Sequence, residues 1–105
     1  MERLSYTLDA PIPAGGTKLQ ALVGIVASGN LEVLLERVLA PDRCTIEIAT
    51  AAHGFGEVWT AVVADFVARR GAGGLRIAIN DGGARPDTAA LRLAQGARLI
   101  AGDMP

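Results

Sequence analysis

The chain has 105 residues with 10 Lys or Arg and 11 Asp or Glu, so its formal net charge at pH 7 is -1. This balance provides no positive field for nucleic acid, and no Lys/Arg cluster indicates binding to an anionic membrane surface. Half of the residues are hydrophobic but only 4% are aromatic, which predicts a mainly aliphatic core in a single domain over residues 1–105.

The first half of the chain has the residue patterns of strands. Residues 4–8 alternate large apolar with polar side chains, which predicts a short edge strand before a Pro- and Gly-containing breaker at residues 11–16. The segment from about Gln20 to Val38 is rich in Val, Ile and Leu on both sides of Ser28-Gly29-Asn30, which predicts a β-hairpin. Residues 44–50 are predicted to form a further strand.

The second half changes to helical spacing. Apolar residues recur every three or four positions from Glu57 to Arg70, and a glycine follows as a stop. Residues 75–80 alternate apolar with polar side chains and predict a strand. A final helix is predicted to end near Ile100, with Asp87 or Thr88 as its N-cap. This order predicts an α+β fold, a two-layer sandwich whose mainly antiparallel four- to five-stranded sheet has two helices on one face.

The hairpin allows a specific prediction of strand register. Gly29-Asn30 tolerates the positive φ angles of a two-residue primed turn. With these residues as the loop, the pairs on the face expected to lie under the helices are Ser28–Leu31, Val26–Val33 and Gly24–Leu35. The other face then carries three apolar residues, Val23, Ile25 and Leu34. Such a surface either binds a protein partner or is covered by a loop or by the N-terminal segment.

Ser28 is the residue to which we assign function, because the turn offers one hydroxyl at the tip of a hairpin. An activated serine nucleophile requires a nearby base, and the sequence has a single histidine, His53. The Gly-x-Ser-x-Gly elbow of hydrolases is absent around Ser28. We therefore predict no catalytic residue in this chain, and we expect another enzyme to modify Ser28.

The other polar residues have structural interpretations. His53 is interpreted as a loop residue or as a cap of the following helix. Cys44 is interpreted as a small buried residue, although a cysteine could in principle hold an acyl group. Asp81 and Asp87 are interpreted as turn and cap residues, and no residue spacing predicts a metal site. A lone cysteine, with no signal peptide or membrane-spanning run, predicts a cytoplasmic protein.

Several blocks of the sequence resemble one family. The segment Val23–Glu36, with Ser28-Gly29-Asn30 at its centre, is similar to the prosthetic-group segment of the malonate decarboxylase acyl-carrier (delta) subunit. The similarity continues through Gly54-Phe-Gly-Glu-Val-Trp59, through residues 75–86, and through Leu91-Arg-Leu93, and so covers most of the chain in order. At position 30, where this chain has Asn, we expect the family more often to have Asp.

The resemblance implies a covalent cofactor. In this family the serine at the position of Ser28 carries 2'-(5''-phosphoribosyl)-3'-dephospho-CoA through a phosphodiester bond, and Gly29 and Asn30 frame the attachment. The thiol of this arm carries acetyl or malonyl groups. The implied partners are an acetyl-S-carrier:malonate carrier-transferase subunit, decarboxylase subunits, and the transferase that attaches the prosthetic group.

Other functions stay open from the sequence. The citrate lyase carrier (gamma) subunit is similar in its prosthetic group and Ser-Gly motif, but less similar in the blocks around Trp59 and Asn80. A non-catalytic α+β interaction module would use Ser28 as an ordinary turn residue. A serine hydrolase is a third alternative, which lacks a motif in its favour.

Overall fold

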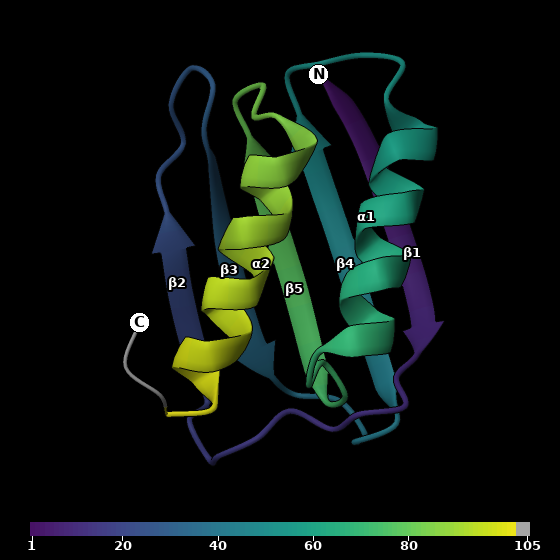
Figure 1. Ribbon diagram of the computed structural model, residues 1–105, viewed down its shortest axis with the longest axis vertical. Helices are drawn as coiled ribbons and strands as arrows, with labels where there is room; N and C mark the ends of the chain where they lie inside the picture. The colour runs from purple at the N-terminus through teal and green to yellow at the C-terminus, as the bar shows by residue number, and fades with distance from the viewer. Residues whose placement is uncertain (103–105) are drawn as a thin grey trace.

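The computed structural model describes residues 1–102 and contains one five-stranded sheet (Figure 1). Its elements in chain order are β1 (Glu2–Asp9), β2 (Gln20–Gly24), β3 (Leu31–Arg37), β4 (Arg43–Thr50), α1 (Gly56–Arg69), β5 (Leu75–Asp81) and α2 (Pro86–Ile100). The strand order is β1-β4-β5-β3-β2, and α1 connects the one parallel pair, β4 and β5. The predicted α+β fold with a mainly antiparallel sheet is confirmed.

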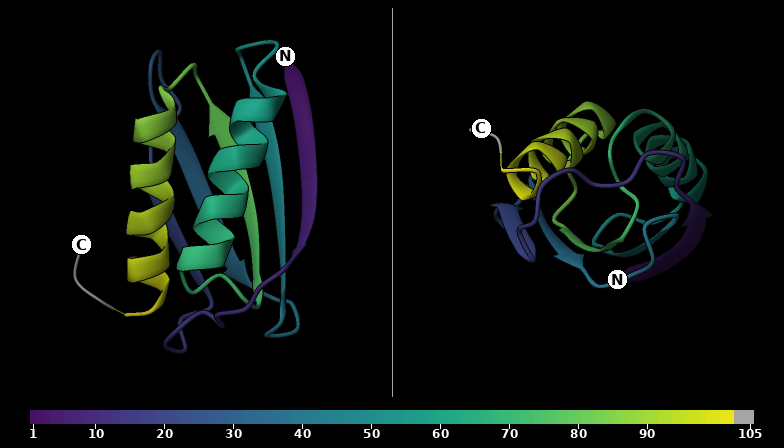
Figure 2. Two further views of the ribbon diagram at one scale, coloured as in Figure 1. Left: turned by 45° about the vertical axis from the view of Figure 1, so that its right-hand side comes forward. Right: turned by 90° about the horizontal axis from the view of Figure 1, so that it is seen from below.

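Both helices cover the same face of the sheet, which forms the second layer (Figure 2). The inward side chains of β3, β4 and β5 are mostly aliphatic and almost completely buried. Trp59 and Phe66 of α1 and Leu93 of α2 complete this core, as their helical spacing predicted. Each such side chain stabilises the fold by roughly 1.5–3 kcal/mol. Within residues 1–102, neither helix combines the length and the apolar character needed to cross a membrane.

The segment between β1 and β2 connects the two edges of the sheet and crosses one end of the molecule (Figure 1). Arg37, at the end of β3, holds it there. The guanidinium donates to the carbonyl oxygens of Ala14 (3.0 Å), Gly15 (2.6 Å), Lys18 (2.9 Å) and Ile100 (3.2 Å). A planar group with five donors can satisfy several carbonyls at once. This side chain therefore joins the β1–β2 segment to β3 and α2, in addition to backbone hydrogen bonds such as that from the Ala14 amide to the Gly73 carbonyl (2.9 Å).

The register of the β2–β3 hairpin differs from the prediction. The observed pairs toward the helices are Val23–Val33 and Ala21–Leu35, three positions away from the predicted pairs. The cause is the loop, which includes residues 25–30 instead of Gly29-Asn30 alone. Gly24 has a φ of 80° and therefore leaves the extended conformation that a regular strand requires. The predicted two-residue turn is wrong for this reason.

This three-residue difference in register changes which residues of β2 face the helices. Leu31, Val33 and Leu35 of β3 lie under the helices as predicted. On β2, Ala21 and Val23 take the inward positions expected for Gly24 and Val26. The prediction that Val23 lies on the other face is therefore wrong. Leu22 and Ile25 are each 59% exposed, so within residues 1–102 no loop covers this surface, and the N-terminal residues form β1 at the other edge of the sheet.

The start of α2 also differs from the prediction. Arg85 is the N-cap residue and its side chain makes no capping hydrogen bond. Pro86 follows in the first turn, where the missing N–H has no helical partner in any case. Asp87 lies inside the helix and accepts a hydrogen bond from the Thr88 amide (3.0 Å). Neither Asp87 nor Thr88 is the N-cap.

Candidate functional site

Ser28 lies exposed at the tip of the β2–β3 loop. It is one of two central residues of a turn that closes when the Asn30 amide donates to the Ala27 carbonyl (3.0 Å). Gly29 has a φ of 74°, which the third residue of a type II turn requires. Nothing lies within 4 Å of the place that a Cβ on Gly29 would occupy. The tip is therefore open to a second molecule.

Asn30 fixes the junction between this turn and β3. Its Oδ1 accepts a hydrogen bond from the Leu31 amide (2.8 Å). Such a side-chain bond to the following backbone is a common way for Asn or Asp to stabilise a turn. The bond uses an acceptor oxygen that Asn and Asp share, so an aspartate at this position could make the same contact.

The serine turn, residues 27–30, is hydrogen-bonded to the loop between β5 and α2. The Gly29 amide donates to the Gly82 carbonyl (3.1 Å), and the Gly82 amide donates to the Asn30 carbonyl (2.8 Å). A Cβ on Gly82 would stand 2.1 Å from the Ala27 carbonyl oxygen, closer than any real contact. Glycine at position 82 therefore permits the two loops to touch.

Asp81 in turn holds the β5–α2 loop. It is the last residue of β5 and is almost completely buried. Its Oδ1 accepts hydrogen bonds from the amides of Gly83 (3.0 Å) and Ala84 (2.8 Å), and its Oδ2 accepts one from the Thr50 hydroxyl (2.7 Å). Bonds to an ionised carboxylate are among the stronger ones in proteins. Asp81 is thus a turn residue, as its sequence context indicated.

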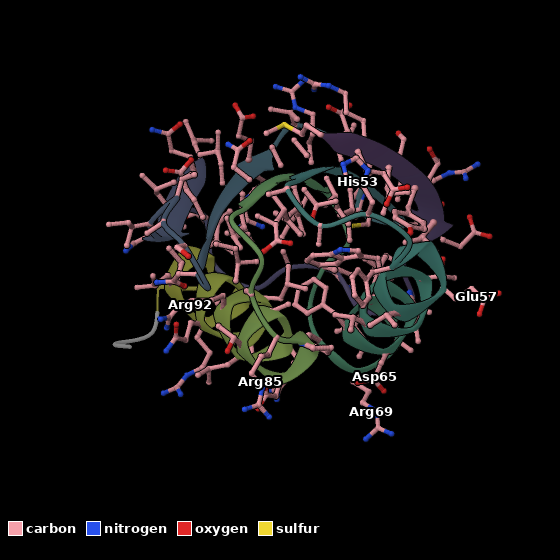
Figure 3. All side chains as sticks on the ribbon, turned by 90° about the horizontal axis from the view of Figure 1, so that it is seen from above. His53, Glu57, Asp65, Arg69, Arg85 and Arg92 are labelled. Carbon is pink, nitrogen blue, oxygen red and sulfur yellow. The ribbon has the colours of Figure 1, made fainter. Side chains whose placement is uncertain are left out.

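The structure does not bring His53 to Ser28. His53 lies exposed in the β4–α1 loop, away from the hairpin, and β5 lies between β4 and β3 (Figure 3). The N-cap of α1 is Phe55, so His53 is a loop residue and not a cap. Among residues 1–102, none hydrogen-bonds the Ser28 hydroxyl. In this part of the chain the Ser28 hydroxyl therefore has no hydrogen-bonded base of the kind that an activated serine requires.

Cys44 lies on β4 with no exposed surface. Burial raises the pKa of its thiol from the usual 9.0 to about 11, because a buried thiolate loses its hydration. The thiolate is the reactive form of cysteine, so this thiol is inert near neutral pH. The structure supports the interpretation of Cys44 as a core residue.

A guanidinium lies close to the base of the serine loop. The Arg92 Cδ atom on α2 is 3.5 Å from the place of a Cβ on Gly24. Nη1 of Arg92 donates to Gln95 Oε1 (3.0 Å), whereas its buried Nε has no hydrogen-bond partner in the described part of the chain. In Figure 3, Arg92 lies on the hairpin side of α2. Neither Arg92 nor Gly82 is near Ser28 along the chain, so no local sequence pattern could have placed them beside this loop.

A pocket of about 270 Å³ opens between the N-terminal parts of α1 and α2, next to the β5–α2 loop. Its lining is mainly apolar, from Phe55, Val58, Trp59, Val62, Ala84, Pro86 and Ala89, with Asp81, Gly83 and Arg85 at the loop. Phe55 is 51% exposed and Val58 is 39% exposed, so large apolar side chains surround the pocket mouth. Through Gly82 the same loop touches the serine turn.

Comparison with known proteins shows the family of the chain. The family model described as malonate decarboxylase delta subunit (MdcD) matches residues 18–100. The chain is 61% identical over 101 residues to the malonate decarboxylase acyl carrier protein of Bradyrhizobium diazoefficiens, covering 96% of both chains. It is 51% identical over 102 residues to that of Xanthomonas campestris pv. campestris, covering 97% of both chains.

A solved structure extends the comparison. A chain in the crystal structure of a Pseudomonas malonate decarboxylase hetero-tetramer in complex with malonate superimposes with a TM-score of 0.82 at 38% identity. The match covers 95% of the present chain and 99% of that chain. These similarities favour the malonate decarboxylase carrier over the citrate lyase carrier. The chain therefore belongs to the malonate decarboxylase delta subunit family of acyl carrier proteins.

Proposed function

We propose that this chain is the acyl carrier subunit of a malonate decarboxylase and that Ser28 carries a 2'-(5''-phosphoribosyl)-3'-dephospho-CoA arm. One observation carries the assignment of the residue. Ser28 stands exposed on a turn that two backbone hydrogen bonds fix to a neighbouring loop, with no base bonded to its hydroxyl among the described residues. This arrangement suits an acceptor of a group that another enzyme attaches.

The residues around Ser28 fit such an arm. The open space at Gly29 leaves room for a bulky substituent at the tip. The arm is polyanionic, and the side chain of Arg92 is a partly exposed cation beside the base of the loop. Guanidinium groups are well suited to phosphate oxygens. We assign Arg92 the role of holding a phosphate of the arm near the hairpin.

In this proposal the carrier positions the thioester, and the partner subunits catalyse its reactions. When bound, the group supplies a thiol for acetyl and malonyl thioesters, whose carbonyl withdraws electrons and makes loss of carbon dioxide easier than from free malonate. The serine loop presents the attachment point to partner enzymes, and tethering makes each encounter effectively intramolecular. The partners in this proposal are the carrier-transferase subunit, the decarboxylase subunits and the prosthetic-group transferase. We propose that the protein acts in the cytoplasm, where thiols stay reduced.

The test is to reconstitute the complete decarboxylase with its prosthetic-group transferase and a Ser28→Ala carrier. We expect this carrier to gain no mass adduct, and the complex to release no acetate and carbon dioxide from malonate. The matched control is Ser5→Ala, which changes the other of the chain's two serines, also exposed, on β1. This control should be modified and active.

Two further readouts separate the alternatives. Partner binding and the thermal midpoint of Ser28→Ala should match the wild type, because an exposed loop hydroxyl without a protein partner contributes little to stability. Turnover of citrate in place of malonate would indicate the citrate lyase carrier. Full malonate turnover with Ser28→Ala would refute the assignment of Ser28.

A further inference from the structure

We propose that the pocket between α1 and α2 shelters the acetyl thioester at the end of the arm while the carrier waits for malonate. The inference rests on the proposed function, because it requires a modified Ser28. It adds a second binding site on the carrier, with a neutral acyl thioester as its ligand.

The position of the pocket is the first reason. The β5–α2 loop forms part of its wall through Gly83 and Ala84, and through Gly82 the same loop is hydrogen-bonded to the serine turn. The β2–β3 loop, the β5–α2 loop and the N-terminal ends of both helices lie at one end of the molecule (Figure 1), so the pocket and the attachment point are at the same end. A long, flexible arm attached to Ser28 can fold back over this short path.

The volume of the pocket limits which part of the arm can enter it. Its volume of about 270 Å³ lies just below the range of roughly 300–1,000 Å³ that is typical of pockets for drug-sized ligands. An acetyl thioester and the few atoms before it fit such a volume, whereas the nucleotide part of the arm does not. The nucleotide phosphates would stay outside, near Arg92.

The chemistry of the lining favours acetyl over malonyl. Trp59, Val62 and Ala89 offer apolar surface, on which a methyl group is stabilised by burial. A malonyl carboxylate would lose its hydration on this apolar lining, which costs free energy unless a partner replaces the lost hydrogen bonds. The cation at the rim, Arg85, is 84% exposed and paired with Asp87 (3.4 Å), so solvent screens its charge.

The exposed apolar side chains at the mouth are consistent with this ligand. Phe55 is the N-cap of α1 and Val58 lies in its first turn, and both side chains are exposed to solvent. Contact with the arm would remove part of this apolar surface from water, which stabilises the closed arrangement. The sheltered carbonyl would then be less accessible to water.

The experiment uses the full modified carrier, acetylated on the arm thiol with a carbon-13 acetyl group. Intact mass first establishes that Ser28 carries the arm. Trp59 is the chain's single tryptophan, so NMR can detect contacts between the acetyl methyl group and its indole ring without ambiguity. We expect such contacts, and we expect hydroxylamine to cleave the carrier thioester about fivefold more slowly than acetyl-dephospho-CoA, in proportion to the fraction of time it is exposed. A malonyl group should gain less protection.

A matched pair of variants assigns the effect to the pocket. Val58→Glu places a carboxylate at the mouth, on a residue exposed enough for the fold to tolerate it, and should remove the indole contacts and the protection. Val38→Glu makes the same change at a residue that is 57% exposed and outside the pocket lining, and should retain both.

The outcomes distinguish this inference from the proposed function. Absence of the adduct would contradict the proposed function itself. An adduct on Ser28 with no indole contact and an unprotected thioester would overturn the pocket inference alone. The inference is also overturned if Val58→Glu weakens binding of a partner subunit but leaves the acetyl signals and the cleavage rate unchanged, because the pocket would then be a protein-docking surface.

Discussion

At the scale of single residues, a glycine distant in sequence sets the position of Ser28. Gly82 exchanges two hydrogen bonds with the serine turn and leaves no room for a side chain. No positive φ is involved at this position, so the requirement for glycine is purely steric. A methyl group there would force the two loops apart.

We therefore predict that Gly82→Ala destabilises the fold by about 1–3 kcal/mol, the usual cost of overpacking. It should also slow attachment of the arm, because the serine turn loses its support. Denaturant unfolding and the rate of adduct formation measure the two effects. Gly56→Ala is the control, since a Cβ at position 56 would meet Leu4 Cδ2 at an ordinary 3.9 Å. Equal stability and equal attachment rates for both variants would contradict the prediction.

The residues of the site were only partly predictable from the sequence. Ser28 could be chosen because turn chemistry is local and one hydroxyl stands in it. The contributions of Gly82 and Arg92 depend on α2 and β5 meeting the hairpin, and no local pattern contains that information. Asp81 was interpreted as a turn residue, but its bond to Thr50 on β4 joins strands that are distant along the chain.

At the scale of elements, one glycine allows α2 to pack closely on β3. A Cβ on Gly96 would stand 2.6 Å from Leu35 Cδ1 and 3.1 Å from Leu35 Cδ2. Leu35 has no exposed surface, so its side chain has little room to move. Glycine inside a helix usually lowers its stability, so the sequence alone gives no reason for Gly96; its packing role depends on the strand beneath it.

We predict that Gly96→Ala lowers the unfolding free energy by about 1 kcal/mol, because overpacking of roughly 1–3 kcal/mol exceeds a gain of about 1 kcal/mol in helix propensity. The double variant Gly96→Ala, Leu35→Val should lose less than the sum of the two single variants, since the smaller side chain makes room for the methyl group. Denaturant titration of the four proteins gives the coupling energy. Strict additivity would show that the two positions do not interact.

The elements themselves were well predicted because each depends on local periodicity. The strand at residues 44–50 and the helix at residues 57–70 agree with β4 and α1 to within one residue at each end. Register was not predictable in the same way. The register depends on the positive φ of Gly24, with which β2 ends, and on the hydrogen bonds between the serine turn and Gly82. The contact with Gly82 is tertiary and cannot be read from local sequence.

At the scale of the whole molecule, the core buries the chain's own thiol, and under the proposed function this keeps Cys44 from competing with the thiol of the arm. In the native unmodified protein we expect no rapid reaction with an aromatic disulfide reagent near pH 8, because Cys44 is buried and protonated. The modified protein should show one fast thiol, that of the arm. Unfolding the unmodified protein should expose one reactive thiol, that of Cys44. A fast thiol in the native Ser28→Ala variant would contradict this prediction.

The same burial predicts a dependence of stability on alkaline pH. The fold favours the neutral thiol, so the pKa of Cys44 is higher in the folded than in the unfolded state. Between about pH 9 and 11 the unfolded state binds fewer protons, and the unfolding free energy therefore decreases as pH rises. Cys44→Ala should show a shallower decrease over this range. Equal slopes would show that another group controls alkaline unfolding.

The position of the two ends of the described chain has a practical consequence for labelling. Glu2 pairs with Thr50 beside the β4–α1 loop, so the N-terminal strand begins at the same end of the molecule as Ser28. The last turn of α2 lies at the opposite end (Figure 1). A fluorophore or affinity tag fused after α2 therefore leaves the end with the serine turn accessible, whereas one fused before β1 lies close to that turn.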